Sequence, residues 1–156
     1  MSSRDGMCLV GVPLERSIGM PRIDNEIVID RRPEDVWAIL GDLGAVTRWV
    51  PGVTSTRMEG MRRICTLEEG GEIHEEIADF SDERRRYRYE QTVHPLGFRR
   101  SEGALAVKPY GEGGARIVWN AELEFADPDQ ETQFLGMLEQ GYAAALERLK
   151  EVVEGG

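Results

Sequence analysis

Three residues with the chemistry of acids, bases and hydrogen-bond donors fall on predicted strands of this sequence: Arg63, Glu75 and Tyr89. If residues 68–71 form the turn between the first two strands, Arg63 lies opposite Glu75. A second turn near Asp82 places Glu75 opposite Tyr89. Because directly opposed residues share one face of an antiparallel sheet, the three side chains form one polar row. Such a row can bind a polar group or move a proton.

Two small residues continue this row. With further turns near Leu96 and Glu112, Tyr89 lies opposite Gly103, and Gly103 opposite Ala121. Small residues beside polar ones leave space, and an apolar cavity with a few polar groups is the usual form of a ligand site. The residues expected to line this site are Arg63, Glu75, Tyr87, Tyr89, Gly103, Leu105, Trp119, Ala121, Phe134, Leu138 and Tyr142. The same turns predict the pairs Cys65–Ile73, Ile77–Tyr87, Glu76–Arg88 and Arg100–Glu124.

The polar row also has a structural interpretation. Arg63 and Glu75 can neutralise each other within a hydrogen-bond network, and ion pairs arise without any function. Cys65 is interpreted as an inert buried thiol and Trp49 as a packing residue. His94, in a turn with a proline, either caps the mouth of the cavity or is simply solvated.

Other kinds of catalytic or metal site lack a signature. His74 and His94 are the only histidines, and the sequence has no HExxH, CxxC or glycine-rich phosphate loop. Cys8 and Cys65 are expected to be reduced thiols, because two cysteines form no disulfide framework. We therefore expect neither a metal nor a cofactor.

Hydrophobic periodicity predicts the elements that position the polar row. An alternating strand over residues 23–29 is followed by a short helix from Pro33 and a shorter turn before Pro51. A long amphipathic helix over residues 130–154 ends the sequence, and its apolar stripe can cover the apolar face of a sheet. Between them lie six segments with alternating apolar residues: 53–58, 62–67, 72–80, 85–93, 99–108 and 115–125.

Composition limits the partners. The 156 residues include 29 acidic and 19 basic side chains, for a formal net charge of −10, which argues against nucleic acids and anionic membranes. No apolar run approaches the ~20 residues of a membrane span, so we expect a cytoplasmic protein without membrane insertion. Residues 1–22 lack a clear period and are expected to be a loosely ordered extension before a single domain over residues 23–154.

The chain resembles a known superfamily. The segments that carry the resemblance are RPEDVWAILGDLGAVTRWVPGV, RRICTLEEGGEIHEEI, RRYRYE and ARIVWNAELEF, followed by the amphipathic helix. They are similar to the START-like helix-grip superfamily (SRPBCC), and in particular to its bacterial polyketide-cyclase-like branch, over about residues 23–153. The resemblance implies an α+β fold: a curved antiparallel sheet of six to seven strands wrapped around a long C-terminal helix, with two short helices after the first strand.

The resemblance implies several functions, because this fold hosts carriers, receptors and enzymes. The first expectation is binding of a small apolar or amphipathic molecule, lipid-like or polyketide-like, by a monomer or homodimer. The alternative is a polyketide cyclase, aromatase or dehydratase, in which Arg63 and Tyr89 orient a poly-ketone chain and Glu75 transfers protons. A third is a protein-interaction role. Glu75 also matches a glutamate that the related abscisic-acid receptors place in the water network of their pocket.

Overall fold

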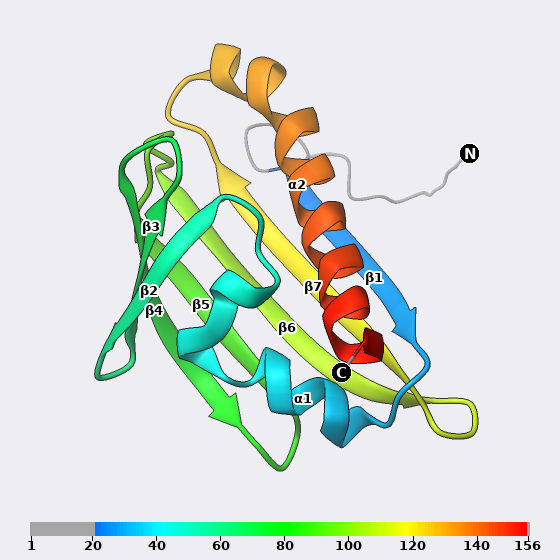
Figure 1. The fold of residues 1–156 in the computed structure, drawn as a ribbon. Coiled ribbons are helices and arrows are strands. Elements are labelled where there is room, and N and C mark those ends of the chain that lie inside the picture. The colour runs from blue at the N-terminus through cyan, green and yellow to red at the C-terminus, as the bar shows by residue number, and fades with distance from the viewer. Residues whose placement is uncertain (1–20, 156) are drawn as a thin grey trace, which may run out of the picture.

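The structure, a computed structural model, describes residues 21–155. Seven antiparallel strands form one curved sheet in the order β1-β7-β6-β5-β4-β3-β2, with the helices on its concave side (Figure 1). This is the predicted α+β helix-grip architecture. The elements are β1 (Arg22–Ile29), α1 (Pro33–Leu40), η2 (Leu43–Arg48), β2 (Val53–Glu59), β3 (Arg62–Leu67), β4 (Glu72–Ser81), β5 (Arg86–Val93), β6 (Arg100–Tyr110), β7 (Gly114–Glu124) and α2 (Pro128–Gly155).

The expectation for the N-terminal extension lies almost wholly outside the described residues. The first described residues, Pro21 and Arg22, already belong to the sheet. Leu123 donates its backbone N–H to the carbonyl of Pro21, and β1 starts at Arg22. None of the helices in residues 21–155 is long and apolar enough to cross a membrane.

Strand β7 shows why the sheet forms. Every second residue is buried and its neighbours are only half-buried, from Ala115 through Ile117 to Leu123. This alternation places one apolar face toward the helices. Neighbouring strands β1 and β6 pair with β7 along its length, so the strand lies inside the sheet.

The helix α2 packs on the sheet in two different ways. In its C-terminal half, Ala145, Leu146, Leu149 and Val153 are buried in the main hydrophobic core. In its N-terminal half, Phe134, Leu135 and Leu138 are only partly buried, against a smaller cluster of Ile23, Ala121, Leu123 and Phe125. The helix therefore anchors the fold through its last turns.

The two short helices α1 and η2 cover the part of the concave face that α2 leaves open (Figure 1). Pro33 occupies the first turn of α1 with Glu34 and Asp35, which suits the positive end of a helix. Trp37 donates its Nε1–H to Asp82 Oδ1 at 2.8 Å, fixing α1 to the turn after β4. The following η2 leads the chain across the sheet toward β2 (Figure 1).

The predicted register is confirmed for the β3–β4 hairpin and wrong for the next one. Arg63 lies opposite Glu75, as expected, but Glu75 lies opposite Gln91 rather than Tyr89. The cause is a bulge between Ala78 and Ser81 together with a longer turn, which shifts the pairing by two residues. The Cys65–Ile73 pair is confirmed, while Ile77 lies opposite Tyr89 instead of Tyr87.

The same shift changes the charged pairs on the outer face. Glu76 lies opposite Glu90, and Arg62 rather than Arg88 forms its ion pair, at 2.6 Å. The predicted Arg100–Glu124 pairing is confirmed in the register, and so are Tyr89–Gly103 and Gly103–Ala121. The Arg100 guanidinium nevertheless donates to Glu102 on its own strand.

Candidate functional site

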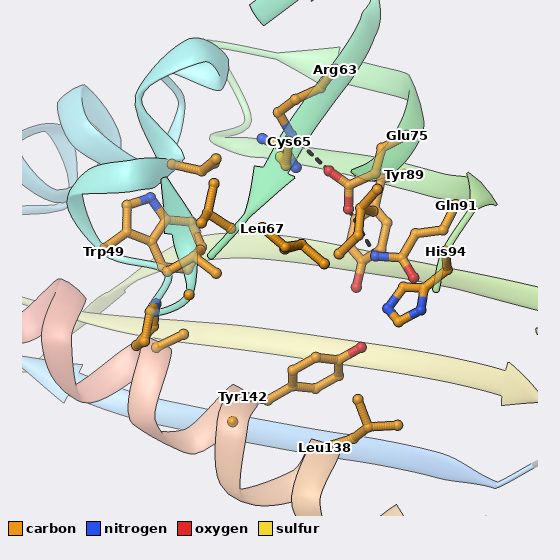
Figure 2. A pocket seen from close by; sticks show the side chains of 18 of the residues that line it. Trp49, Arg63, Cys65, Leu67, Glu75, Tyr89, Gln91, His94, Leu138 and Tyr142 are labelled. Atoms are coloured by element: carbon orange, nitrogen blue, oxygen red, sulfur yellow. Dashed lines mark hydrogen bonds and ion pairs between the residues drawn. The ribbon is translucent and has the colours of Figure 1, made fainter. Parts of the chain in front are cut away.

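A cavity of about 420 Å³ lies between the concave face of the sheet and the middle of α2 (Figure 2). Its inner wall comes from strands β3 to β7, and η2 with the loop after it closes one side. Such a volume is within the range of small-molecule sites, roughly 300–1,000 Å³. The buried or half-buried residues of the wall include Val46, Trp49, Arg63, Cys65, Ile73, Glu75, Tyr87, Tyr89, Gln91, Leu105, Trp119, Leu138, Tyr142 and Ala145.

Polar side chains on four strands form one hydrogen-bonded row along this wall. Arg63 donates from Nε to Glu75 Oε1 at 2.8 Å and from Nη1 to Tyr87 Oη at 3.4 Å. Glu75 Oε2 accepts a bond of 3.0 Å from Gln91 Nε2. Gln91 Oε1 in turn accepts a 2.6 Å bond from the Ser101 hydroxyl. Both oxygens of Glu75 are thus occupied by protein donors.

Burial makes this row energetically demanding. Arg63 is 4% exposed and Glu75 is 7% exposed, so neither charge is compensated by bulk water. Burial alone would lower the pKa of Arg63, but the nearby Tyr87 and Glu75 oxygens outweigh it and raise the pKa. The guanidinium therefore stays charged, and its carboxylate partner is needed to balance it.

Aromatic side chains form a second wall. The rings of Trp119 and Tyr142 stack with centroids 4.4 Å apart, and Trp49 meets Trp119 edge-on at 5.9 Å. Trp119 donates its Nε1–H to Tyr89 Oη at 3.0 Å. Burial raises the pKa of Tyr142 to about 12 and that of Tyr89 well above its usual value. Both phenols are therefore protonated donors at neutral pH.

The mouth of the cavity is marked by lining residues that are exposed. They come from the loop before β2, the β3–β4 turn and α2: Pro51, Gly52, Glu68, Glu69, Met137 and Gly141. Met137 is 55% exposed, a large apolar side chain at the rim. Two carboxylates and apolar groups thus frame the route into the cavity.

His94 lies at the edge of the cavity, on the loop after β5 (Figure 2). Its Nδ1 accepts a 3.1 Å bond from the Leu96 backbone N–H, which assigns the proton to Nε2, and its ring packs on Phe98 at 4.7 Å. Burial lowers the pKa of His94 to about 4, although Glu75 opposes this effect in part. The imidazole is neutral at physiological pH.

The His94 pKa leads to a pH-dependence of stability. The unfolded chain protonates this histidine near pH 6.5 and the folded protein only near pH 4, so the unfolded state binds protons preferentially between them. The free energy of unfolding should therefore fall as pH decreases from about 6.5 toward 4. Urea unfolding across this range should show a shallower decline for His94→Asn, whose Oδ1 can replace Nδ1 as acceptor. Parallel curves for the two proteins would contradict this assignment.

Eight of the eleven residues predicted for the site line the cavity, namely Arg63, Glu75, Tyr87, Tyr89, Leu105, Trp119, Leu138 and Tyr142. Gly103, Ala121 and Phe134 are not among the lining residues. The Tyr89 ring lies over Gly103 so closely that a Cβ there would collide with it. Ala121 and Phe134 pack in the smaller apolar cluster instead. Gly103 therefore makes room for Tyr89 rather than for a ligand.

Sequence reasoning missed several lining residues. Gln91 was hidden by the two-residue register error, although its spacing from Tyr87 and Tyr89 places all three on one strand face. Trp49, interpreted as a packing residue, does both: it is buried and it lines the cavity. Cys65 also lines the cavity, and burial raises the pKa of its thiol, which keeps it protonated.

Comparison with known protein families gives one match over nearly the whole chain. Residues 20–154 match the family described as polyketide cyclase / dehydrase and lipid transport. The chain belongs to this family. Comparison with curated proteins finds no match.

Solved structures share the fold of this family member at low sequence identity. The protein XoxI from Bacillus cereus is 22% identical, with a TM-score of 0.76 over 85% of this chain and 94% of that chain. The Zhui aromatase/cyclase from Streptomyces sp. R1128 is 14% identical, with a TM-score of 0.72 over 86% and 94%. A START superfamily protein from Mycobacterium smegmatis is 14% identical, with a TM-score of 0.69 over 84% and 98%. These similarities confirm the predicted fold, and together with the family match over residues 20–154 they confirm the predicted superfamily.

Proposed function

We propose that this protein binds a small, largely apolar, uncharged ligand, lipid-like or polyketide-like, in the cavity between the sheet and α2. The observation that carries the proposal is the cavity itself, about 420 Å³ and lined by apolar and aromatic side chains with a few buried polar groups. Trp119, Tyr142 and Leu138 provide apolar contact area, and the buried polar row provides orientation. The family description, which includes lipid transport, supports this proposal.

The polar groups favour a ligand with oxygen acceptors. The protonated hydroxyls of Tyr89 and Tyr142 and the Nε2–H of His94 are all donors, and Figure 2 shows the Tyr142 hydroxyl directed toward the polar row. Glu68 and Glu69 at the mouth repel a carboxylate, and the Arg63 charge inside is already balanced by Glu75. Ketone, ester and hydroxyl oxygens suit this site better than a free acid.

Gly141→Leu should abolish most binding of the uncharged fluorescent probe N-phenyl-1-naphthylamine. Gly141 lines the mouth on α2, and a Cβ there meets no atom within 4 Å, so the new side chain fills ligand space without steric strain. Replacing a mid-helix glycine also favours the helix by about 0.5–1 kcal/mol. We expect a tenfold or greater rise in the probe dissociation constant, with no loss of thermal stability.

Gly136→Leu is the matched control. Gly136 lies on the same helix and is equally unobstructed, but it does not line the cavity. It should gain the same helical stability and bind the probe like the unmodified protein. Equal loss of binding in both variants, or none in either, would show that the probe does not use this cavity.

An activity as a polyketide cyclase, aromatase or dehydratase is the second candidate. The family description and the fold shared with an aromatase/cyclase support it. In this case Tyr89 and Tyr142 would donate hydrogen bonds to ketone oxygens and so polarise the carbonyl groups, while Arg63 and Glu75 hold the row in place. Two measurements discriminate between the candidates. If the protein is a carrier, native mass spectrometry of the protein from its own host should show an intact bound ligand, and an added linear poly-ketone should remain unchanged. If it is an enzyme, the added poly-ketone should be converted to product.

A further inference from the structure

The convex face of the sheet carries a second concavity, on the side opposite the ligand cavity. It measures about 390 Å³ and lies over strands β5, β6 and β7. Its floor consists of the half-buried side chains of Ala104, Ala106 and Val118, with Asn120 at one end. Because these small residues project outward between longer ones, they leave a depression with an apolar base.

Basic side chains surround this depression in a protein whose net charge is −10. Arg84, Arg86 and Lys108 are exposed, line the concavity and form no ion pair with any residue in 21–155. Arg88 differs, since Asp79 at 3.4 Å and Glu102 at 3.2 Å balance it. Asp79, the one carboxylate among the lining residues, pairs with Arg88, so Arg84, Arg86 and Lys108 leave an excess of three positive charges at this rim.

Strand register brings these charges close together. Lys108 lies directly opposite Arg116 on β7, and Arg86 lies opposite Ala106, two residues before Lys108 on β6. Opposed like charges on neighbouring strands are destabilising, and only Arg116 has a local partner, Glu26 at 3.3 Å. A bound anion would relieve this repulsion.

We propose that this concavity binds the phosphate ester of a compact small molecule. The phosphoryl group lies between Arg84, Arg86 and Lys108, because planar guanidinium groups bind phosphate oxygens in pairs and an ammonium adds a point charge. The organic part rests on the floor of Ala104 and Ala106. A compact ligand fits a hollow of this size better than a flat membrane surface would. This proposal is independent of the function proposed for the inner cavity.

Calorimetric titration of the full chain with pyrophosphate and with ADP tests the proposal. Both should bind saturably and more weakly at high salt, with ADP tighter because its base and ribose add contact with the floor. The double variant R86Q/K108Q should weaken both by about tenfold or more, since it removes two charge-assisted contacts. Its unfolding temperature without ligand should not decrease, because the substitutions remove like-charge repulsion.

R32Q/R57Q is the matched control, with the same change in net charge. Arg32 and Arg57 are exposed, form surface ion pairs and do not line the concavity on the convex face. The R32Q/R57Q variant should bind pyrophosphate and ADP with dissociation constants within about twofold of those of the unmodified protein. The absence of saturable binding, or equal losses in both double variants, would overturn the proposal. Binding of a hexaglutamate peptide or of phosphatidylglycerol vesicles, but not of ADP, would also overturn it, in favour of an acidic protein or a membrane.

Discussion

Replacing Glu75 by Gln is expected to lower the free energy of unfolding by about 3–5 kcal/mol, measured by urea denaturation. The carboxylate accepts from Arg63 at 2.8 Å through one oxygen and from Gln91 at 3.0 Å through the other. An amide has a single acceptor oxygen and no charge, so the substitution leaves a buried guanidinium unbalanced and one buried donor without a partner.

The neighbouring cross-strand pair, one residue before Arg63 on β3 and one residue after Glu75 on β4, provides a matched control. Arg62 and Glu76 form the same kind of cross-strand pair at 2.6 Å, but about half of each side chain is exposed. Glu76→Gln should therefore cost less than about 1 kcal/mol. If Glu75→Gln lowered the free energy of unfolding by as little as Glu76→Gln, then solvent or another anion would be balancing the Arg63 charge. That result would contradict a buried Arg63–Glu75 ion pair.

A double variant separates the structural role of this pair from a role in binding. Arg63→Met together with Glu75→Leu removes both charges at similar volume, and such replacements are often neutral for stability. Recovered stability with weakened binding of N-phenyl-1-naphthylamine would mean that the row orients ligand. Recovered stability with unchanged binding would mean that the row serves only the fold. Both outcomes are informative because the first two variants establish the energetic baseline.

The hairpins show which part of the register can be read from sequence. The β3–β4 turn contains Gly70 and Gly71, both at positive φ, and two adjacent glycines mark such a turn plainly. The β4–β5 connection gives no comparable signal. Its bulge uses Asp79 at φ 51° and its turn uses Arg85 at φ 51°. Aspartate adopts a left-handed backbone more often than most residues, but one aspartate among other polar residues does not locate a bulge, and arginine gives no such signal. A register error of two residues was the result.

The same distinction applies to the cavity. Its strand-borne residues, such as Tyr87, Tyr89 and Trp119, follow from period-2 alternation, because a strand fixes which side chains face inward. Trp49 and His94 reach the cavity from non-strand segments, whose placement depends on tertiary packing rather than on local pattern. The sequence predicts the pairing of Gly103 with Tyr89 correctly, but it cannot reveal that the Tyr89 ring occupies the space above Gly103.

The two halves of α2 should respond very differently to loss of a leucine side chain. Leu149 is 0% exposed in the main core, so Leu149→Ala should lower the free energy of unfolding by about 2–5 kcal/mol through lost burial and a new internal void. Leu138 is half-buried and lines a cavity that already exists, so Leu138→Ala should cost only about 1 kcal/mol.

Urea unfolding of both variants, with Leu135→Ala as a partly buried reference outside the cavity, gives the comparison. A larger loss for Leu138 than for Leu149 would mean that the N-terminal half of α2 is closed tightly on the sheet, with no room for a ligand. The expected order instead assigns stability to the last turns of the helix. The turns around Leu138 and Gly141 are then free to border a ligand, because the fold does not depend on their complete burial.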